Sequence, residues 1–136
     1  MQKIRQSIVD EARSWLGIPF KHQGRTIDGV DCVGLVIVVA HALGLSDFET
    51  HQYSRHPSPT MMGRILDAEM VRIKISEALP GDVYWMRFFK DPQHLAIISD
   101  KGIIHSFSNV KKVTEHRIDK RWKNRIMGAY RFKGLN

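Results

Sequence analysis

The chain has 136 residues and a formal net charge of +7, with 43% hydrophobic and 26% charged residues. These values predict one globular domain with a single core, and the sequence contains no repeat or low-complexity stretch. Its single cysteine excludes an internal disulfide and is compatible with a reducing compartment. The excess positive charge favours anionic partners such as an acidic wall polymer, a nucleic acid or a membrane surface.

The N-terminus carries no recognisable targeting signal. Asp10 and Glu11 fall where a signal peptide needs an apolar core. The longest apolar run, at residues 33–45, includes His41 and is too short to span a bilayer. We therefore expect synthesis in the cytoplasm without a signal peptide, and no membrane insertion. Delivery outside the cell would then depend on another component.

Two helices are predicted in the first part of the chain. An apolar stripe at helical spacing marks residues 4–16, and Gly17 ends it. The β-branched residues at 33–45 would also suit a buried strand. The length of this run, Asp31 as a possible N-cap and Gly44 at a C′ position favour a helix instead. A helix that is apolar nearly all round is expected at the centre of the core.

The remainder of the chain is dominated by strand patterns. Polar, proline-containing residues 50–60 predict a loop, followed by a short helix capped near Ser58 or Thr60. After a turn at 79–82, strands are predicted at 82–89, 94–99, 102–107, 113–118 and 125–132. The basic segment 118–134 is interpreted as an ordinary strand with a solvated face. Helices followed by an antiparallel sheet predict an α+β fold.

Cys32 is the candidate nucleophile. The thiolate is the reactive form, and an ordinary cysteine has a pKa of about 8.5. At the start of a helix, the helix dipole and a neighbouring imidazolium would lower that pKa. The free N–H groups of the first turn would also suit an oxyanion hole. Alternatively, Cys32 is a small, inert residue that fills the core.

His94 and His105 belong to two predicted strands joined by a short turn. If Ser99 pairs with Gly102, the two histidines are diagonal neighbours on one face, roughly 7–8 Å apart. This placement suits a general base and its orienting partner. The same residues would suit a metal site with Cys32, but their spacing matches no compact zinc motif. No metal or other cofactor is therefore expected.

The other histidines are weaker candidates. His22 lies close to Cys32 in the sequence and is expected to line the cleft. His41 is expected to be buried on the central helix, and His51 and His56 to lie in the polar loop. No catalytic role is predicted for these last three.

Four blocks of sequence, in order, resemble the NlpC-type cell-wall peptidases, which are papain-like cysteine peptidases. They are ARSWLGIPFKHQGRTIDGVDCVGLV, LPGDVYWMRF, QHLAIIS and GIIHSF. The resemblance covers about residues 8–132 and implies a single papain-like domain, residues 1–136. In that fold the nucleophile begins a buried central helix that packs on a C-terminal antiparallel sheet. KHQG and GAYRF are most similar to the short branch found in phages and gene-transfer agents. This similarity implies a tail-associated enzyme that opens the bacterial wall during DNA entry.

Catalytic roles follow from the resemblance residue by residue. It implies that Cys32 is the nucleophile, His94 the general base and His105 the residue that orients His94. The implied reaction is hydrolysis of an amide in the peptide stems of peptidoglycan, through a thioester. The backbone N–H of Cys32 is the implied oxyanion donor.

Two positions depart from the family pattern. Phe20 replaces a tyrosine whose hydroxyl helps hold the site, and Val33 replaces a serine. In relatives that cut next to γ-D-glutamate, the aspartate and serine beside the cysteine grip the free amino end of the stem. Asp31, Phe20 and His22 are thus the expected substrate-binding residues. The resemblance implies the reaction class and leaves the cleaved bond open.

Two other functions remain open at this stage. One is a non-catalytic tail or wall-binding module of the same fold, and the other is a papain-like amidase or acyltransferase acting on another substrate. Nucleic-acid binding is not expected, because no recognised motif or aromatic-lined basic stripe is present. The expected partners are peptidoglycan or its stem peptides, and phage tail proteins.

Overall fold

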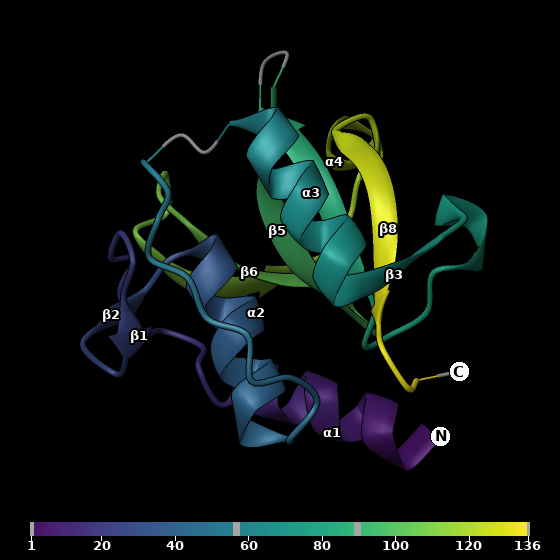
Figure 1. The fold of residues 1–136 in the computed structure, drawn as a ribbon, viewed down its shortest axis with the longest axis horizontal. Helices are drawn as coiled ribbons and strands as arrows, with labels where there is room; N and C mark the ends of the chain where they lie inside the picture. Colours follow the sequence, from purple (N-terminus) through teal and green to yellow (C-terminus); the bar gives the residue numbers. More distant parts are fainter. Residues whose placement is uncertain (1, 56–57, 89–90, 136) are drawn as a thin grey trace.

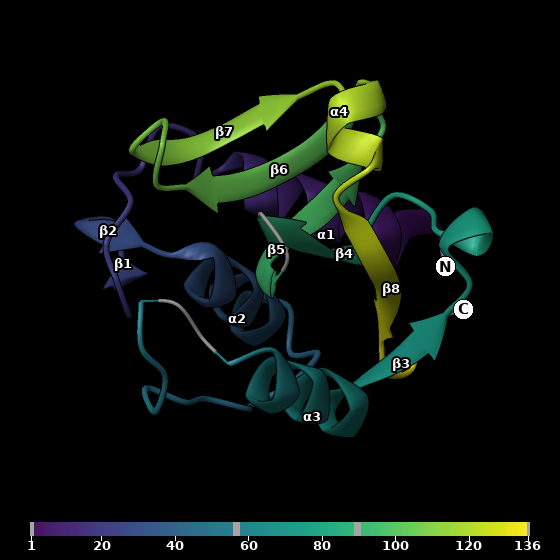
Figure 2. The ribbon, with the colours of Figure 1, turned by 90° about the horizontal axis from the view of Figure 1, so that it is seen from above.

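The computed structural model describes residues 2–55, 58–88 and 91–135 (Figure 1). Three main helices, α1 (Gln2–Arg13), α2 (Cys32–Ala42) and α3 (Pro59–Glu69), pack with a six-stranded antiparallel sheet. Figure 2 shows that the sheet curves and that α2 and α3 lie on its concave side. Helix α1 contacts α2. The predicted α+β fold is confirmed.

The strand order in the sheet is β3-β8-β4-β5-β6-β7, so the last strand of the chain lies between β3 and β4. A separate two-stranded hairpin, β1-β2, precedes α2. The strands are β1 (Arg25–Thr26), β2 (Gly29–Val30), β3 (Met70–Ile73), β4 (Val83–Phe88), β5 (Asp91–Ser99), β6 (Gly102–Phe107), β7 (Lys112–His116) and β8 (Ile126–Phe132). The short helices are η1 (Ile75–Glu77) and α4 (Lys120–Lys123).

Helix α2 begins and ends as its sequence predicts. The Asp31 side chain accepts a hydrogen bond from the Gly34 N–H at 2.7 Å, which caps the first turn. At the other end, Gly44 has a φ of +67°, the left-handed conformation that favours glycine at C′. Leu35 and Val39 are buried in the core between the helices and the sheet. Burial therefore selects a helix over the strand that β-branched residues would favour.

His41 is not buried, so the prediction for this residue is wrong. It is exposed near the end of α2, and its Nε2 donates to the Phe48 carbonyl at 2.7 Å. Helical periodicity turns this position outward, although its neighbours Val39 and Ala40 are buried. The apolar run therefore concealed one solvent-facing stripe on the helix.

The basic C-terminal segment also differs from its prediction. It is not a continuous strand, because Lys120–Lys123 form helix α4, whereas the strand predicted at 125–132 is confirmed as β8 (Ile126–Phe132). The Asp119 side chain caps α4 by accepting from the Trp122 N–H at 3.0 Å. The prediction also missed β1, β2 and β3, because strands this short carry little periodicity. Of the predicted 50–60 loop, residues 56–57, and with them His56, lie outside the described residues.

Asp82, in the turn before β4, is a buried anchor for both ends of the chain. Its carboxylate accepts from Arg5 on α1 at 3.1 Å. Arg131 on β8 donates to it at 3.1 and 3.0 Å, and the Leu79 N–H donates at 2.9 Å. A fully buried carboxylate is tolerated because these donors compensate for its lost hydration.

No helix in the described ranges is long and apolar enough to cross a membrane.

We predict that Asp82→Ala lowers the free energy of unfolding by about 3 kcal/mol, because it leaves Arg5 and Arg131 without their shared carboxylate. Urea unfolding followed by circular dichroism measures this change. The exposed Asp28→Ala is the matched control and is expected to change stability by less than about 0.5 kcal/mol. Equal effects of the two substitutions would contradict a structural role for Asp82.

Candidate active site

Cys32 is the first residue of α2 and lies against β5. Its Sγ is 4.0 Å from the Gln93 carbonyl oxygen, and the Leu95 backbone N–H is a second contact. The thiol thus meets the backbone on both sides of His94. The side chain is half-buried. The loop-to-helix junction therefore brings the only cysteine to one of the two candidate histidines.

The β5–β6 hairpin has the register that the sequence predicted. Ser99 pairs with Gly102, and the two histidines come together on one face. His94 Nε2 lies 2.6 Å from His105 Nδ1, and both side chains are buried. The Nε2 of His94 is therefore engaged by His105, and Nδ1 is its other ring nitrogen.

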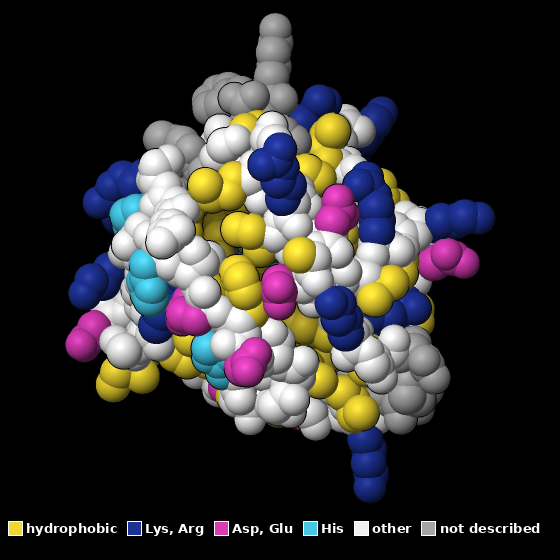
Figure 3. Space-filling model, in the orientation of Figure 1, with side chains coloured by type: hydrophobic (Ala, Val, Ile, Leu, Met, Phe, Trp, Pro, Cys, Tyr) yellow, Lys and Arg dark blue, Asp and Glu magenta, His cyan; other side chains and the backbone are white. Residues whose placement is uncertain are grey.

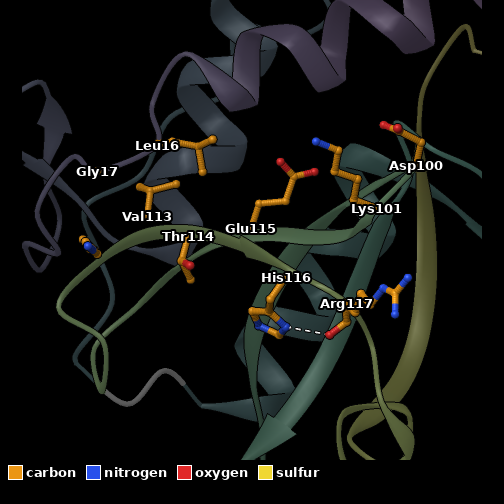
Figure 4. Close-up of a pocket in the computed structure, with 10 residues that line it drawn as sticks. Leu16, Gly17, Asp100, Lys101, Val113, Thr114, Glu115, His116 and Arg117 are labelled. Atoms are coloured by element: carbon orange, nitrogen blue, oxygen red, sulfur yellow. Dashed lines mark hydrogen bonds between the residues drawn. The ribbon is translucent and has the colours of Figure 1, made fainter.

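A third histidine, which the sequence analysis did not single out, extends this pair. His116 on β7 places its Nε2 2.9 Å from His105 Nε2. Its Nδ1 lies 2.7 Å from the Arg117 carbonyl oxygen, the bond drawn in Figure 4.

His116 also lines an open groove at the β7 edge with Leu16, Glu115 and Lys101. In the β6–β7 register, His105 faces Thr114, so His116 is its diagonal neighbour. The parity argument used for the first hairpin would have found it, had the length of the second turn been known.

Aromatic rings enclose the histidines. Phe107 stacks on His105 with ring centroids 5.3 Å apart, and Trp122 of α4 meets the same ring edge-on at 5.2 Å. Phe88 lies 4.9 Å from the His94 ring, and the Arg125 guanidinium lies 4.6 Å from the Trp122 ring centre. These contacts fix the ring planes and exclude water from the histidine pair.

Burial makes both histidines neutral. It lowers the pKa of His94 to about 3, with Arg125 and His116 adding to the effect. Burial also lowers the pKa of His105 to about 2, with His94 and His116 contributing. A neutral imidazole at position 94 is the form that can accept a proton.

Burial raises the pKa of the Cys32 thiol, whereas the helix dipole would lower it. The raised pKa is about 12, and the neighbouring Asp31 carboxylate adds to the rise. Backbone N–H groups of Leu95, Val33 and Cys32 oppose it by stabilising the thiolate. The expected lowering of the thiol pKa is therefore wrong for the free protein. Desolvation together with the Asp31 carboxylate outweighs the helix N-terminus and the backbone N–H groups.

Asp31 connects three segments beside the nucleophile. One oxygen, Oδ1, caps α2, while Oδ2 accepts from the Gln23 N–H at 2.7 Å and from the Tyr53 hydroxyl at 2.8 Å. His22 lies nearby, with Nδ1 3.8 Å from Oδ2, and its ring meets Tyr53 edge-on. The structure thus brings two of the expected substrate-binding residues, Asp31 and His22, together beside Cys32.

Phe20, the third expected substrate-binding residue, is half-buried, and its backbone hydrogen bonds are with residues other than Asp31, His22 and Cys32. Its N–H donates to the Lys111 carbonyl at 2.9 Å, and its backbone bridges to Val30. Phe20 has no hydroxyl, but the Tyr53 phenol supplies one close to Cys32 by donating to the adjacent Asp31.

The polar segment 46–55 runs past α2 (Figure 1). Side chains of the preceding hairpin region hold it in place. Gln23 donates to the carbonyls of His51 and Tyr53, both at 2.7 Å. Arg25 donates to the Thr50 carbonyl at 2.7 Å and to the Glu49 carboxylate at 3.0 Å. The sequence analysis missed Gln23, Arg25 and Tyr53, because nothing in a polar loop indicates which segment it will contact.

Small apolar cavities lie beneath segment 46–55. Figure 3 shows hydrophobic side chains in the hollow between α3 and segment 46–55. One cavity of about 40 Å³ is lined by Val33, Thr50, Tyr53, Met61, Met62, Ile65 and Leu95. Val33, which stands where many relatives have serine, thus faces an apolar space beside the nucleophile. Across the described part of the chain, no group of three or more His, Cys, Asp or Glu side chains is arranged to hold a metal ion.

A cysteine at a helix N-terminus, packed against a strand that carries a histidine, defines a papain-like α+β protein. The model of the NlpC/P60 family matches residues 17–131, and the chain belongs to this family.

Individual relatives agree with this assignment. The probable peptidoglycan endopeptidase LytE of Bacillus subtilis (strain 168) is 28% identical over 129 residues, which is 92% of this chain and 34% of LytE. The chain thus spans about a third of that relative's length.

Among solved structures, the NlpC/P60 domain of the peptidoglycan hydrolase SagA has a TM-score of 0.64 at 20% identity, covering 93% of this chain and 97% of that one. An NlpC/P60 family protein from Bacillus cereus ATCC 10987 has a TM-score of 0.72 at 18% identity, covering 94% and 40%. At these identities, the structural matches establish the fold alone.

The neutral histidines predict acid lability. Each has a folded-state pKa below its unfolded value, so unfolding takes up protons and stability is lost as pH falls below about 6.5. We expect His105→Phe to reduce the slope of unfolding free energy against pH by about 1.4 kcal/mol per unit near pH 5. Urea titrations at several pH values measure the slope, and the exposed His41→Phe is the control for loss of a histidine. An unchanged slope in His105→Phe would contradict burial of a neutral imidazole.

Proposed function

We propose that the protein is a cysteine peptidase that hydrolyses amide bonds in the peptide stems of peptidoglycan. The observation that carries this proposal is the placement of Cys32 at the start of α2, against the strand that holds His94. The far nitrogen of His94 is engaged by His105. This is the order of nucleophile, base and orienting residue that thiol acyl transfer requires. Family membership and the endopeptidase among its relatives support peptidoglycan as the substrate.

The reaction proceeds by covalent catalysis. As Cys32 Sγ attacks the scissile carbonyl carbon, its proton passes to His94 Nδ1, because the free thiol is protonated and the imidazole is neutral. The backbone N–H of Cys32 stabilises the oxyanion of the tetrahedral intermediate. His94 then gives the proton to the leaving amine, and a thioester remains. Water deprotonated by His94 hydrolyses the thioester and restores the thiol.

Asp31 and His22 are proposed to bind the substrate beside the nucleophile. In the free protein the Asp31 carboxylate accepts from Gln23 and Tyr53, so a substrate ammonium would compete with the Tyr53 hydroxyl for Oδ2. Phe20 contributes an apolar base to the same region. Val33 and the cavity of about 40 Å³ beside it favour a small apolar group over a polar one at that position.

The alternative is a non-catalytic wall-binding or tail module of the same fold. The observation that favours it is the burial of the Cys32 thiol, which raises its pKa to about 12. A papain-like amidase or acyltransferase on another substrate is the third possibility. Products released from peptidoglycan distinguish these functions.

We predict that the purified protein releases soluble fragments from peptidoglycan sacculi, and that mass spectrometry identifies newly cleaved stem peptides. Cys32→Ser should abolish release, and His94→Ala should lower the rate by about 10²–10⁴-fold because the general base is lost. The exposed His41→Ala is the matched control and should retain full activity. Release that is equal in Cys32→Ser and in the wild type would contradict the peptidase assignment, as would absence of any cleavage across Gram-positive and Gram-negative sacculi.

We also propose that the protein acts as part of a phage or prophage tail, made in the cytoplasm and carried to the wall by the particle. The KHQG and GAYRF segments support this location by their similarity to the tail-associated branch. The net charge of +7 suits an anionic wall.

The tail proposal predicts that the chain co-purifies with tail particles in a density gradient, as detected by mass spectrometry. Particles carrying Cys32→Ala should assemble and adsorb normally but inject DNA poorly through an intact wall. Injection equal to that of wild-type particles would favour the structural module. Absence of the chain from purified tails would contradict the tail location.

A further inference from the structure

We propose that His116 is a positioning residue that sets the tautomer of the His94–His105 pair, so that His94 presents a bare Nδ1 to Cys32. The role is an extension of the proposed cysteine peptidase mechanism and rests on it. It assigns a function to a third histidine, on β7, that has no contact with Cys32 among the described hydrogen bonds.

The Arg117 carbonyl is hydrogen-bonded to the outermost of the three rings, His116. His116 Nδ1 lies 2.7 Å from this oxygen, and a carbonyl oxygen can only accept a hydrogen bond. His116 Nδ1 must therefore carry a proton. A neutral His116 then has its lone pair on Nε2. One backbone group thus fixes the tautomer at the outer end of the chain of rings.

The tautomer of His116 in turn determines the tautomers of His105 and His94. His116 Nε2, as an acceptor, requires the proton of His105 to be on Nε2, 2.9 Å away. A neutral His105 then has a bare Nδ1, which accepts from His94 Nε2 at 2.6 Å. The proton of a neutral His94 is thereby placed on Nε2. Its lone pair is left on Nδ1, the nitrogen that must accept the proton of Cys32.

The surroundings favour this assignment over the reversed one. Burial keeps His94 and His105 neutral, so each ring carries one proton and the contacts between rings must alternate donor and acceptor. Trp122 packs against both rings: its centroid lies 5.2 Å from that of His105 and 4.8 Å from that of His116. This packing holds the two imidazoles in their relative positions. In the reversed arrangement, His116 Nδ1 would oppose the Arg117 oxygen with a lone pair, a repulsive contact.

The tautomers can be observed directly. Long-range ¹H–¹⁵N correlation spectra of ¹⁵N-histidine-labelled protein, at about pH 8 where imidazoles are largely neutral, distinguish protonated from bare ring nitrogens. We expect protonated Nδ1 in His116 and protonated Nε2 in His105 and His94. Protonated Nδ1 in His94, or protonated Nε2 in His116, would overturn the proposal. This readout is independent of any substrate, so it can fail or succeed separately from the peptidase assignment.

Two substitutions test the catalytic consequence. His116→Phe keeps an aromatic ring against Trp122 but removes the acceptor, so His105 loses its fixed tautomer and His94 should become a mixture of tautomers. We expect kcat for stem-peptide hydrolysis to fall about tenfold with KM unchanged, the size of one lost hydrogen bond. His116→Gln can place an amide oxygen near the Nε2 position and should restore most of kcat. The exposed His41→Gln should match the wild type.

The outcomes separate the two proposals. Wild-type hydrolysis that is lost in Cys32→Ser, with equal kcat in His116→Phe and the wild type, would keep the peptidase and overturn the role of His116. Equal losses in His116→Phe and His116→Gln would also overturn it, because a structural role needs no acceptor. If the wild type hydrolyses no stem peptide, the peptidase proposal fails, while the spectra still decide the tautomers.

Discussion

The structure around the nucleophile depends on one buried carboxylate. Asp31 caps α2, accepts from the turn at Gln23 and accepts from Tyr53 in segment 46–55. A buried carboxylate must be satisfied by hydrogen bonds, so three segments distant in sequence converge on it. Because Cys32 follows Asp31 directly, the same interaction that starts the helix also sets the position of the thiol. The capping residue thus sets both the start of the helix and the position of the thiol.

The second organising feature is the row of histidines across β5, β6 and β7. Each strand contributes one ring, and the antiparallel register brings His94, His105 and His116 into a line of hydrogen bonds. Aromatic side chains bury the inner two rings, His94 and His105. Burial lowers the pKa of both imidazoles, and hydrogen bonds are stronger in such an environment than in water. The same burial raises the pKa of the Cys32 thiol, so the proposed mechanism relies on proton transfer during attack and not on a preformed ion pair.

Much of the fold and part of the site could be predicted from local chemistry. The Asp31 cap, Gly44 and the length of the apolar run identify α2, and the turn after Ser99 fixes the partnership of His94 with His105. The prediction failed for His41 because hydrophobicity averaged over a run hides a single outward position. It failed for α4 because a short helix capped by Asp119 carries no periodic signal. His116 was missed because its register depends on a longer turn whose geometry the sequence does not specify.

The sequence by itself determined the helix that begins at Cys32 and the histidine hairpin, because capping, turn length and strand alternation act over a few residues. Only the tertiary structure decided the protonation of these groups. Burial is a property of the whole packed chain, and it raises the pKa of Cys32 while lowering that of His94. Tertiary structure also decided that Tyr53 and Gln23 meet at Asp31, since such long-range contacts follow from how the elements pack and not from any local pattern.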